Sequence, residues 1–172
     1  MPHILAIDQG TTGTTVLVLD EHLTVKARGY SEFAQLYPQP GWVEHEPDAI
    51  MRSVFEALER AVRQSGVATT DWAAVGITNQ RETVVLWDRK TGEPVHNAIV
   101  WQDRRTSDVC AAKIDAGTQD AVRAATGLPL DPYLSAAKLA WMLDQGDLLG
   151  LLMERGSFAE AEAADYFGQL AL

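Results

Sequence analysis

The sequence has one cysteine, no internal repeat, no low-complexity tract and no long hydrophobic run. Cys110 cannot form a disulfide within the chain, and its apolar neighbours favour a buried thiol over a nucleophile. No stretch approaches the ~20 apolar residues of a membrane span, and Asp8 interrupts the apolar start too early for a signal peptide. These absences argue against a disulfide-stabilised or membrane protein and predict a soluble, cytoplasmic one.

Positive charge is also scarce. The 172 residues include 14 lysines and arginines against 24 aspartates and glutamates, so the formal net charge is −10. This excess repels nucleic-acid backbones, and the basic residues are scattered apart from two short pairs, so nucleic acid is not an expected partner. The four histidines show no i, i+4 pair and no paired cysteines accompany them, which argues against a zinc site.

Hydrophobic residues make up 47% of the chain, enough for the core of one domain of this length. The first thirty-odd residues predict an antiparallel meander of three strands, at His3–Asp8, Thr14–Leu19 and Leu23–Phe33. A loop with two prolines and a glycine follows. Pro47 and Asp48 then suit the first turn of a helix.

The second half continues with strands and then changes to the helical period. Trp72–Thr78 is typical of a buried strand, and further strands are expected at Thr83–Trp87 and Val95–Trp101. Three short helices are predicted at Arg104–Ala116, Gln119–Ala125 and Pro132–Asp144. This order predicts an α/β fold with a mixed sheet. Residues 145–172 carry no motif and are expected to form a helical or disordered tail.

The segment DQGTTGTT, residues 8–15, lies on the turn between the first two predicted strands. Two glycines let backbone amides approach an anion, threonines add hydroxyl donors, and an acid at the preceding strand end can hold Mg²⁺. The pattern therefore predicts a small phosphate and metal site. Alternatively, Gly10 and Gly13 only form a hairpin that Asp8 caps. The segment is neither a Walker loop nor a dinucleotide fingerprint, because a strand follows the turn.

Three further polar segments offer groups to a ligand with several hydroxyls. Arg81 and Glu82 lie in the polar stretch TNQRET between two predicted strands. Trp101 ends a strand, where it can cover carbon atoms, and Tyr133 begins a helix, where its hydroxyl can face a ligand. A structural role fits each segment equally well: a solvated turn, a core tryptophan followed by a solvated helix start at 104–105, and an ordinary helix start.

Five segments in this order resemble the N-terminal part of glycerol kinases, in the carbohydrate kinase superfamily with the actin-like, ribonuclease-H-like fold. They are AIDQGTT at 6–12, YPQPGWVEH at 37–45, GITNQRET at 76–83, NAIVWQ at 97–102, and 126–133 with its Thr-Gly and Asp-Pro-Tyr. The first is shared by sugar kinases generally, whereas the segments with Arg81 and Trp101 favour glycerol over a pentose or hexose. The resemblance implies ATP-dependent phosphorylation of glycerol to sn-glycerol 3-phosphate, with ATP and Mg²⁺ as cofactors.

The family's site residues carry over to the matching positions. The resemblance implies that Asp8 lies near Mg²⁺ and that Arg81, Glu82, Trp101 and Tyr133 contact glycerol. It implies phosphate contacts of ATP or ADP at Gly10, Thr11, Thr12, Gly13 and Thr15. Where the family usually has Ser-Arg after its threonines, this chain has Thr14-Thr15, so a cationic nucleotide contact is missing.

The resemblance ends near Asp144, before the family's general-base aspartate and second domain. We therefore expect 1–144 to be an incomplete N-terminal kinase domain and 145–172 to be a divergent tail that follows a truncation or frameshift. Little or no turnover is expected from the chain by itself, because phosphoryl transfer needs a base and a complete cleft. The alternatives are a kinase for another small polyol and a non-catalytic remnant or partner-binding module. An incomplete sheet also predicts self-association or a homo-oligomer.

Overall fold

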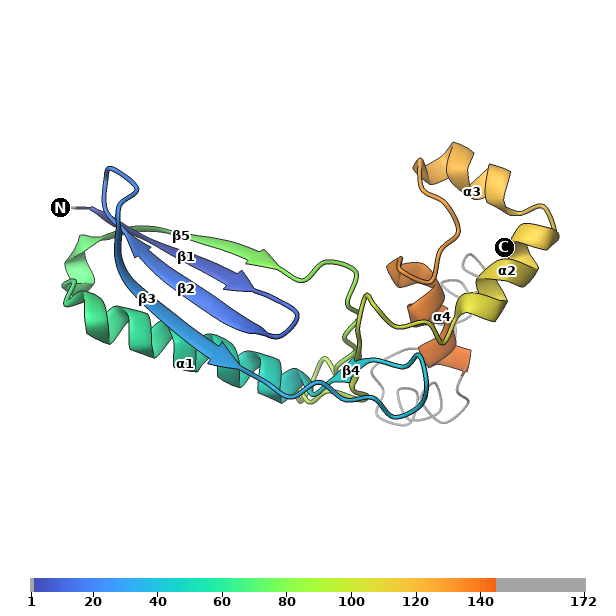
Figure 1. The fold of residues 1–172 in the computed structure, drawn as a ribbon, viewed down its shortest axis with the longest axis horizontal. Helices are drawn as coiled ribbons and strands as arrows, with labels where there is room; N and C mark the ends of the chain where they lie inside the picture. Colours follow the sequence, from blue (N-terminus) through green and yellow to red (C-terminus); the bar gives the residue numbers. More distant parts are fainter. Residues whose placement is uncertain (1, 145–172) are drawn as a thin grey trace. The chain divides into compact units, whose positions relative to one another are not determined.

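A computed structural model describes residues 2–144, apart from the side chain of residue 69, and divides the chain into two compact units (Figure 1). The first unit comprises 2–36 and 45–81 of the described residues, and the second comprises 37–44 and 82–144. The predicted tail at 145–172 lies outside the described residues. No helix in the described part is long and apolar enough to cross a membrane.

The first unit is a four-stranded mixed sheet with one long helix. Its strands are β1 (His3–Gln9), β2 (Gly13–Leu19), β3 (Val25–Glu32) and β5 (Trp72–Asn79), in the order β3-β2-β1-β5. The first three strands are antiparallel neighbours, which confirms the predicted meander, and β5 is parallel to β1. The expected α/β fold with a mixed sheet is therefore confirmed. A short 3₁₀ helix, η1 (Thr69–Asp71), precedes β5.

Helix α1 (Pro47–Ser65) lies along one face of this sheet, as Figure 1 shows. Proline stands in its first turn, as predicted, and the helix ends at Gly66 in the left-handed conformation with φ 63°. Its buried residues are small, and a Cβ on Gly29 of β3 would lie 1.8 Å from the Ala57 carbonyl oxygen. Glycine at 29 is therefore required for this close approach of helix and strand.

Leu5, Val16, Val18 and Ala27 pack with α1 to form the core of the first unit. Strand β5 forms at the predicted position, but the expectation that it is buried is wrong. All its residues after Trp72 are exposed, including Val75 at 56% and Ile77 at 74%. The reason is that β5 is an edge strand that none of the described residues covers.

The second unit consists mainly of loops and short helices. Strands β4 (Glu44–His45) and β6 (Ala98–Ile99) form a two-residue pairing. The predicted strands at 83–87 and 95–101 are wrong in extent, since they form only β6 and the single bridges Val84 to Ile99 and Trp87 to Pro94. The helices are α2 (Ser107–Asp115), α3 (Gln119–Thr126) and α4 (Ser135–Asp144).

Helices α2 and α4 begin three residues later than predicted, because a turn held by side chains precedes each of them. Asp103 accepts hydrogen bonds from the Arg105 backbone and side chain, and Lys138 binds the carbonyls of 132–134. Cys110 on α2 is buried, as predicted, and burial raises the pKa of its thiol. A core around Val84, Ile99 and Met142 packs α4 against β6 and the neighbouring loops of this unit.

Candidate functional site

The turn between β1 and β2, residues 10–13, has all four of its carbonyl oxygens engaged by donors of the protein. The bonds run from Gln9 Nε2 to Gly10 O at 2.7 Å, Gln35 Nε2 to Thr11 O at 2.9 Å, Phe33 N to Thr12 O at 3.4 Å and Gly10 N to Gly13 O at 2.9 Å. Because these carbonyl oxygens already accept hydrogen bonds from the protein, they repel a nearby anion less than free carbonyls would. The backbone N–H of Thr12 has no hydrogen-bond partner among residues 2–144, so it can donate to a phosphate oxygen.

Glycine at 13 is required by packing rather than by backbone angle. A Cβ there would lie 2.5 Å from the Ser31 carbonyl oxygen and 3.0 Å from the Tyr30 hydroxyl. At Gly10 a Cβ would lie 3.1 Å from the Gly13 carbonyl oxygen. The turn is therefore tighter than any residue with a side chain would allow, and this leaves its backbone open to a close ligand.

Asp8 and Thr15 lie side by side on the sheet next to this turn. Asp8 pairs with Thr15 of β2 and with Thr78 of β5, so these three side chains share the face opposite Leu5 and Val16 of the core. Together with their neighbours on β1, β2 and β5 they line a shallow depression of about 370 Å³. The Asp8 carboxylate is exposed and makes no hydrogen bond within residues 2–144, so it does not cap the hairpin.

The residues around Asp8 fit a Mg²⁺ ion that is held mainly by other ligands. No group of three or more acidic, histidine or cysteine side chains gathers anywhere in the described chain. Mg²⁺ commonly uses one or two carboxylates and completes its shell with water and substrate phosphate oxygens. One exposed carboxylate beside a turn with an available backbone N–H matches that requirement. The site therefore suits a metal ion that arrives with a phosphate ligand.

Three of the residues expected to contact a polyol come together in the second unit. The rings of Trp101 and Tyr133 meet edge to face, with centroids 5.9 Å apart and an interplanar angle of 76°. The Glu82 carboxylate is tied to the same helix start, because its Oε2 accepts from the backbone N–H and the hydroxyl of Ser135, each at 2.8 Å. Its Oε1 has no partner among the described residues. An acceptor and two aromatic rings are thus presented from one unit.

Arg81 is the last residue of the first unit and directly precedes Glu82 in the chain. Its side chain is exposed and forms no hydrogen bond or ion pair with any residue from 2 to 144. Glu82 has φ 64°, which is uncommon for a residue with a side chain. Strained backbone of this kind concentrates at functional sites. The solvated-turn interpretation therefore fits Arg81 better than Glu82.

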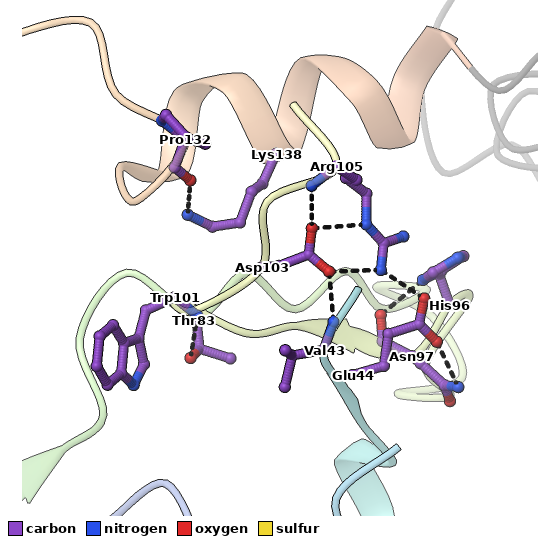
Figure 2. A network of polar contacts seen from close by, with 10 residues as sticks. All are labelled: Val43, Glu44, Thr83, His96, Asn97, Trp101, Asp103, Arg105, Pro132 and Lys138. Carbon is purple, nitrogen blue, oxygen red and sulfur yellow. Dashed lines mark hydrogen bonds and ion pairs between the residues drawn. The ribbon is translucent and has the colours of Figure 1, made fainter. Parts of the chain in front are cut away.

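Lys138 of α4 holds the backbone on which Tyr133 stands. Its ammonium is fully buried and donates to the carbonyls of Pro132 at 3.0 Å, of Leu134 at 2.9 Å and of Tyr133 between them. Figure 2 shows the bond to Pro132. Burial lowers the pKa of Lys138, and nearby Glu82 opposes that shift. Sequence reasoning missed this residue, although a lysine between apolar helix positions was a visible signal.

Arg105 is the centre of a buried group of charged side chains in the second unit (Figure 2). Its side chain is 1% exposed, and it bonds Glu44 at 2.7 Å and Asp103 at 2.9 Å. The guanidinium also packs against the rings of Trp42 and Trp141, at 3.8 and 4.5 Å from their centroids, and the two rings meet each other edge to face. The prediction of a solvated helix start is therefore wrong for Arg105, although its neighbour Arg104 is exposed.

The buried ion pairs of Arg105 with Glu44 and Asp103 hold the loop that carries Trp101. Asp103 accepts from the Val43 backbone N–H at 2.7 Å, and Asn97 donates to Glu44 at 3.0 Å, so the acids join three loop segments (Figure 2). The Trp101 backbone N–H donates to the Thr83 hydroxyl at 3.3 Å. The backbone at Trp101 is thus held by its own bond to Thr83 and by the bonds of Asp103, two residues later, while the tryptophan itself stays half-buried.

Residues 3–148 match the N-terminal domain model of the FGGY family of carbohydrate kinases. A glycerol kinase of Cereibacter sphaeroides is 55% identical over 144 residues, which is 84% of this chain and 29% of that protein. A glycerol kinase of Methylibium petroleiphilum is 49% identical over 159 residues, or 92% of this chain and 32% of that protein. The chain thus spans about three tenths of the length of these curated relatives.

Solved structures agree with these relatives. The crystal structure of Plasmodium falciparum glycerol kinase with ADP superposes with a TM-score of 0.80 at 32% identity, over 91% of this chain and 31% of that one. Xylulose kinase from Rhodospirillum rubrum superposes with a TM-score of 0.76 at 25% identity, over 86% of this chain and 30% of that one. Sequence and fold lead to the same conclusion: the chain belongs to the FGGY family of carbohydrate kinases and represents its N-terminal domain.

Proposed function

We propose that this chain supplies the phosphate-binding turn and the polyol-binding residues of an ATP-dependent glycerol kinase, which forms sn-glycerol 3-phosphate. The observation that carries the proposal is the meeting of Glu82, Trp101 and Tyr133 around the start of α4. These are three of the four residues whose types and spacing resemble the glycerol site of that family. The glycerol kinases among its relatives support the same substrate.

At the nucleotide side, the turn at 10–13 would donate backbone N–H groups to the phosphates of ATP or ADP. Thr12 has the free N–H, while the hydroxyls of Thr11 and Thr15 add donors. Asp8 would hold Mg²⁺, directly or through water. When bound, the metal ion neutralises charge on the transferred phosphoryl group. The Plasmodium glycerol kinase structure was solved with ADP, which supports a nucleotide as the ligand.

At the polyol side, the Glu82 Oε1 oxygen would accept a hydrogen bond from one glycerol hydroxyl. The Arg81 guanidinium would donate to a hydroxyl, the Tyr133 phenol would contact another, and Trp101 would cover the carbon skeleton. A ligand that lacks a hydroxyl leaves such polar groups unpaired, which is how the site would discriminate against it. The same residues would determine whether another small polyol binds instead.

The reaction itself needs a carboxylate that takes the proton of the attacking hydroxyl. In the family that this chain resembles, that carboxylate comes from a part of the sequence beyond the region of resemblance at 1–144. We propose that the 172-residue chain binds glycerol weakly and has little turnover alone, and that it acts in the cytoplasm, where both substrates are present. A non-catalytic, partner-binding role is the competing proposal, supported by the exposed apolar residues of β5.

Two measurements on the purified chain test these proposals. A coupled assay with ATP, Mg²⁺ and glycerol reports turnover, and a rate typical of kinases that Arg81→Ala abolishes would contradict the proposed inactivity. Ligand-observed NMR with glycerol, with another small polyol and with a deoxy analogue reports binding. Glycerol binding that Glu82→Gln removes supports the polyol site. Equal binding of all three ligands, or none at millimolar concentration, contradicts it.

A further inference from the structure

A chain of buried polar side chains lies behind the phosphate-binding turn of the first unit. His45 is completely buried, and Gln9 and Gln80 are 9% and 8% exposed. The bonds are Gln35 Oε1 to His45 Nε2 at 2.6 Å, His45 Nδ1 to Gln80 Nε2 at 3.4 Å and Gln80 Nε2 to Gln9 Oε1 at 3.3 Å. Buried polar groups are costly unless they are satisfied, so this chain calls for an explanation.

Both ends of this hydrogen-bonded series of side chains bond to the turn. Gln35 Nε2 donates to the Thr11 carbonyl at 2.9 Å, and Gln9 Nε2 donates to the Gly10 carbonyl at 2.7 Å. The backbone adds a further tie, since the Gln80 N–H donates to the Gln9 carbonyl at 2.7 Å, just beyond the last pair of β1 and β5. Two adjacent peptide carbonyls of the turn are therefore connected through one histidine.

One assignment of protons satisfies every bond. Because Gln35 uses its amide nitrogen on Thr11, its oxygen must accept, and His45 must carry its proton on Nε2. His45 Nδ1 then accepts from Gln80, whose second amide proton is given to Gln9. A protonated imidazole would place an N–H donor on Nδ1 against the Gln80 amide N–H. The hydrogen-bonded series therefore requires a neutral ring.

The surroundings of the ring favour that neutral form. Phe33 packs edge to face against His45, with centroids 4.9 Å apart, and the ring nitrogens bond to the uncharged side chains of Gln35 and Gln80. Burial lowers the pKa of His45 to about 4. The ring is therefore uncharged at neutral pH, and its hydrogen bonds to Gln35 and Gln80 determine the tautomer.

We propose that His45 is a positioning residue for the phosphate-binding turn: through Gln35 and through Gln80 and Gln9, it holds the carbonyls of Thr11 and Gly10 so that the amides of the turn remain available to an anion. The inference rests on the proposed nucleotide role of that turn. It adds His45 of β4 and Gln80, which follows β5, to a site that otherwise consists of β1, β2 and the turn between them.

The test compares His45→Phe with His45→Gln in the full chain. Phenylalanine keeps a ring but removes both nitrogens, whereas glutamine keeps a donor for Gln35. His22→Phe is the matched control, because His22 is an exposed histidine in the same unit. Two quantities are measured: hydrogen exchange by NMR of the Gly10 and Phe33 amides, which donate to the Gly13 and Thr12 carbonyls of the turn, and the dissociation constant for Mg·ADP.

We expect His45→Phe to speed exchange at both amides and to weaken Mg·ADP binding about tenfold, since it removes two buried hydrogen bonds that position the turn. His45→Gln should recover part of both effects, and His22→Phe should change neither. If His45→Phe leaves exchange and affinity within about twofold of the unaltered chain, the proposal is overturned.

The two readouts separate this inference from the proposed function. If the unaltered chain does not bind Mg·ADP, the nucleotide role of the turn fails, yet faster exchange in His45→Phe alone still supports a positioning role. Should His45→Phe not fold, Gln35→Leu removes the Thr11 branch from a half-buried position and is held to the same two criteria. The ¹⁵N shifts of the His45 ring in the unaltered chain provide a further check, and a proton on Nδ1 would contradict the assignment.

Discussion

The Glu82 carboxylate accepts two hydrogen bonds from Ser135, one from its backbone N–H and one from its hydroxyl, each at 2.8 Å. The two residues are 53 positions apart in the sequence. A carboxylate at a helix N-terminus is stabilised by the free N–H groups and by the dipole there. Ser135 therefore fixes one carboxylate oxygen and leaves the other for a ligand.

Ser135→Ala should weaken glycerol binding several-fold, because the carboxylate keeps the backbone bond but loses the hydroxyl that fixes its rotamer. Folding stability should fall by about 1 kcal/mol, the usual net value of one hydrogen bond. Ser135→Thr retains a hydroxyl and is the matched control. Glycerol titration by NMR and urea unfolding measure the two effects, and equal affinities for the alanine and threonine variants would contradict this role of the hydroxyl.

Lys138→Met should loosen the turn at 132–134, since three carbonyls lose their donor while the side-chain volume is nearly kept. A loss of about 1–3 kcal/mol in the free energy of unfolding is expected for buried groups left unpaired. The ring resonances of Tyr133 should shift as its contact with Trp101 changes. Lys113→Met on α2 is the control. Unchanged Tyr133 resonances in Lys138→Met would show that the lysine does not position this ring.

Arg105→Met should be the most destabilising single change in the second unit. It removes the cation between Glu44 and Asp103, whose side chains are 7% and 0% exposed, and it leaves two buried carboxylates close together. Breaking a buried ion pair from one side costs about 3–5 kcal/mol. Arg104→Met, at an exposed position, should cost far less. Urea unfolding of both variants measures the difference, and similar midpoints would refute the importance of the buried centre.

The exposed residues of β5 should promote self-association of the chain. Val75 and Ile77 are large apolar side chains on an edge strand, 56% and 74% exposed, and exposed edges of this kind pair with other chains. Replacing both with threonine keeps strand propensity and removes apolar surface. Sedimentation velocity over a concentration series should show a lower mean mass for the double variant, and a monomeric unaltered chain would exclude this association.

The sequence was sufficient for the elements with strong local patterns. The meander of β1 to β3 follows from alternation and tight turns, and the start of α1 follows from Pro47 and Asp48. The expected strand at 83–87 failed because TVVLW has β propensity but no neighbouring strand long enough to pair with. Pairing is a tertiary property that local composition does not contain.

The same distinction between local pattern and tertiary contact separates the site residues that the sequence predicted from those that it did not. Residue types and spacing pointed to Glu82, Trp101 and Tyr133, and the structure brings these three together. Lys138 and His45 were missed, because each acts through partners that are distant in the chain or through carbonyls that any residue has. Arg105 was misjudged because only the fold brings the rings of Trp42 and Trp141 against its guanidinium.

Folding stability should fall as the pH drops from about 6.5 to about 4, through His45. Burial lowers the pKa of this residue from an ordinary value of 6.5 to about 4 in the folded chain. The unfolded chain therefore binds the proton first, so the contribution is complete above pH 6.5 and is lost as the pH falls toward 4. A difference of this size corresponds to at most about 3 kcal/mol.

Carboxylates titrate at the lower end of this range, so the effect of His45 has to be isolated by difference. Urea unfolding at pH 7 and at pH 4.5 gives the loss of free energy for the unaltered chain and for His45→Gln, which has no titratable group at this position. The unaltered chain should lose more, by about 2–3 kcal/mol, while His22→Phe should behave like the unaltered chain because His22 is exposed. If His45→Gln lost as much stability as the unaltered chain between the two pH values, a neutral, buried His45 would be ruled out as the cause.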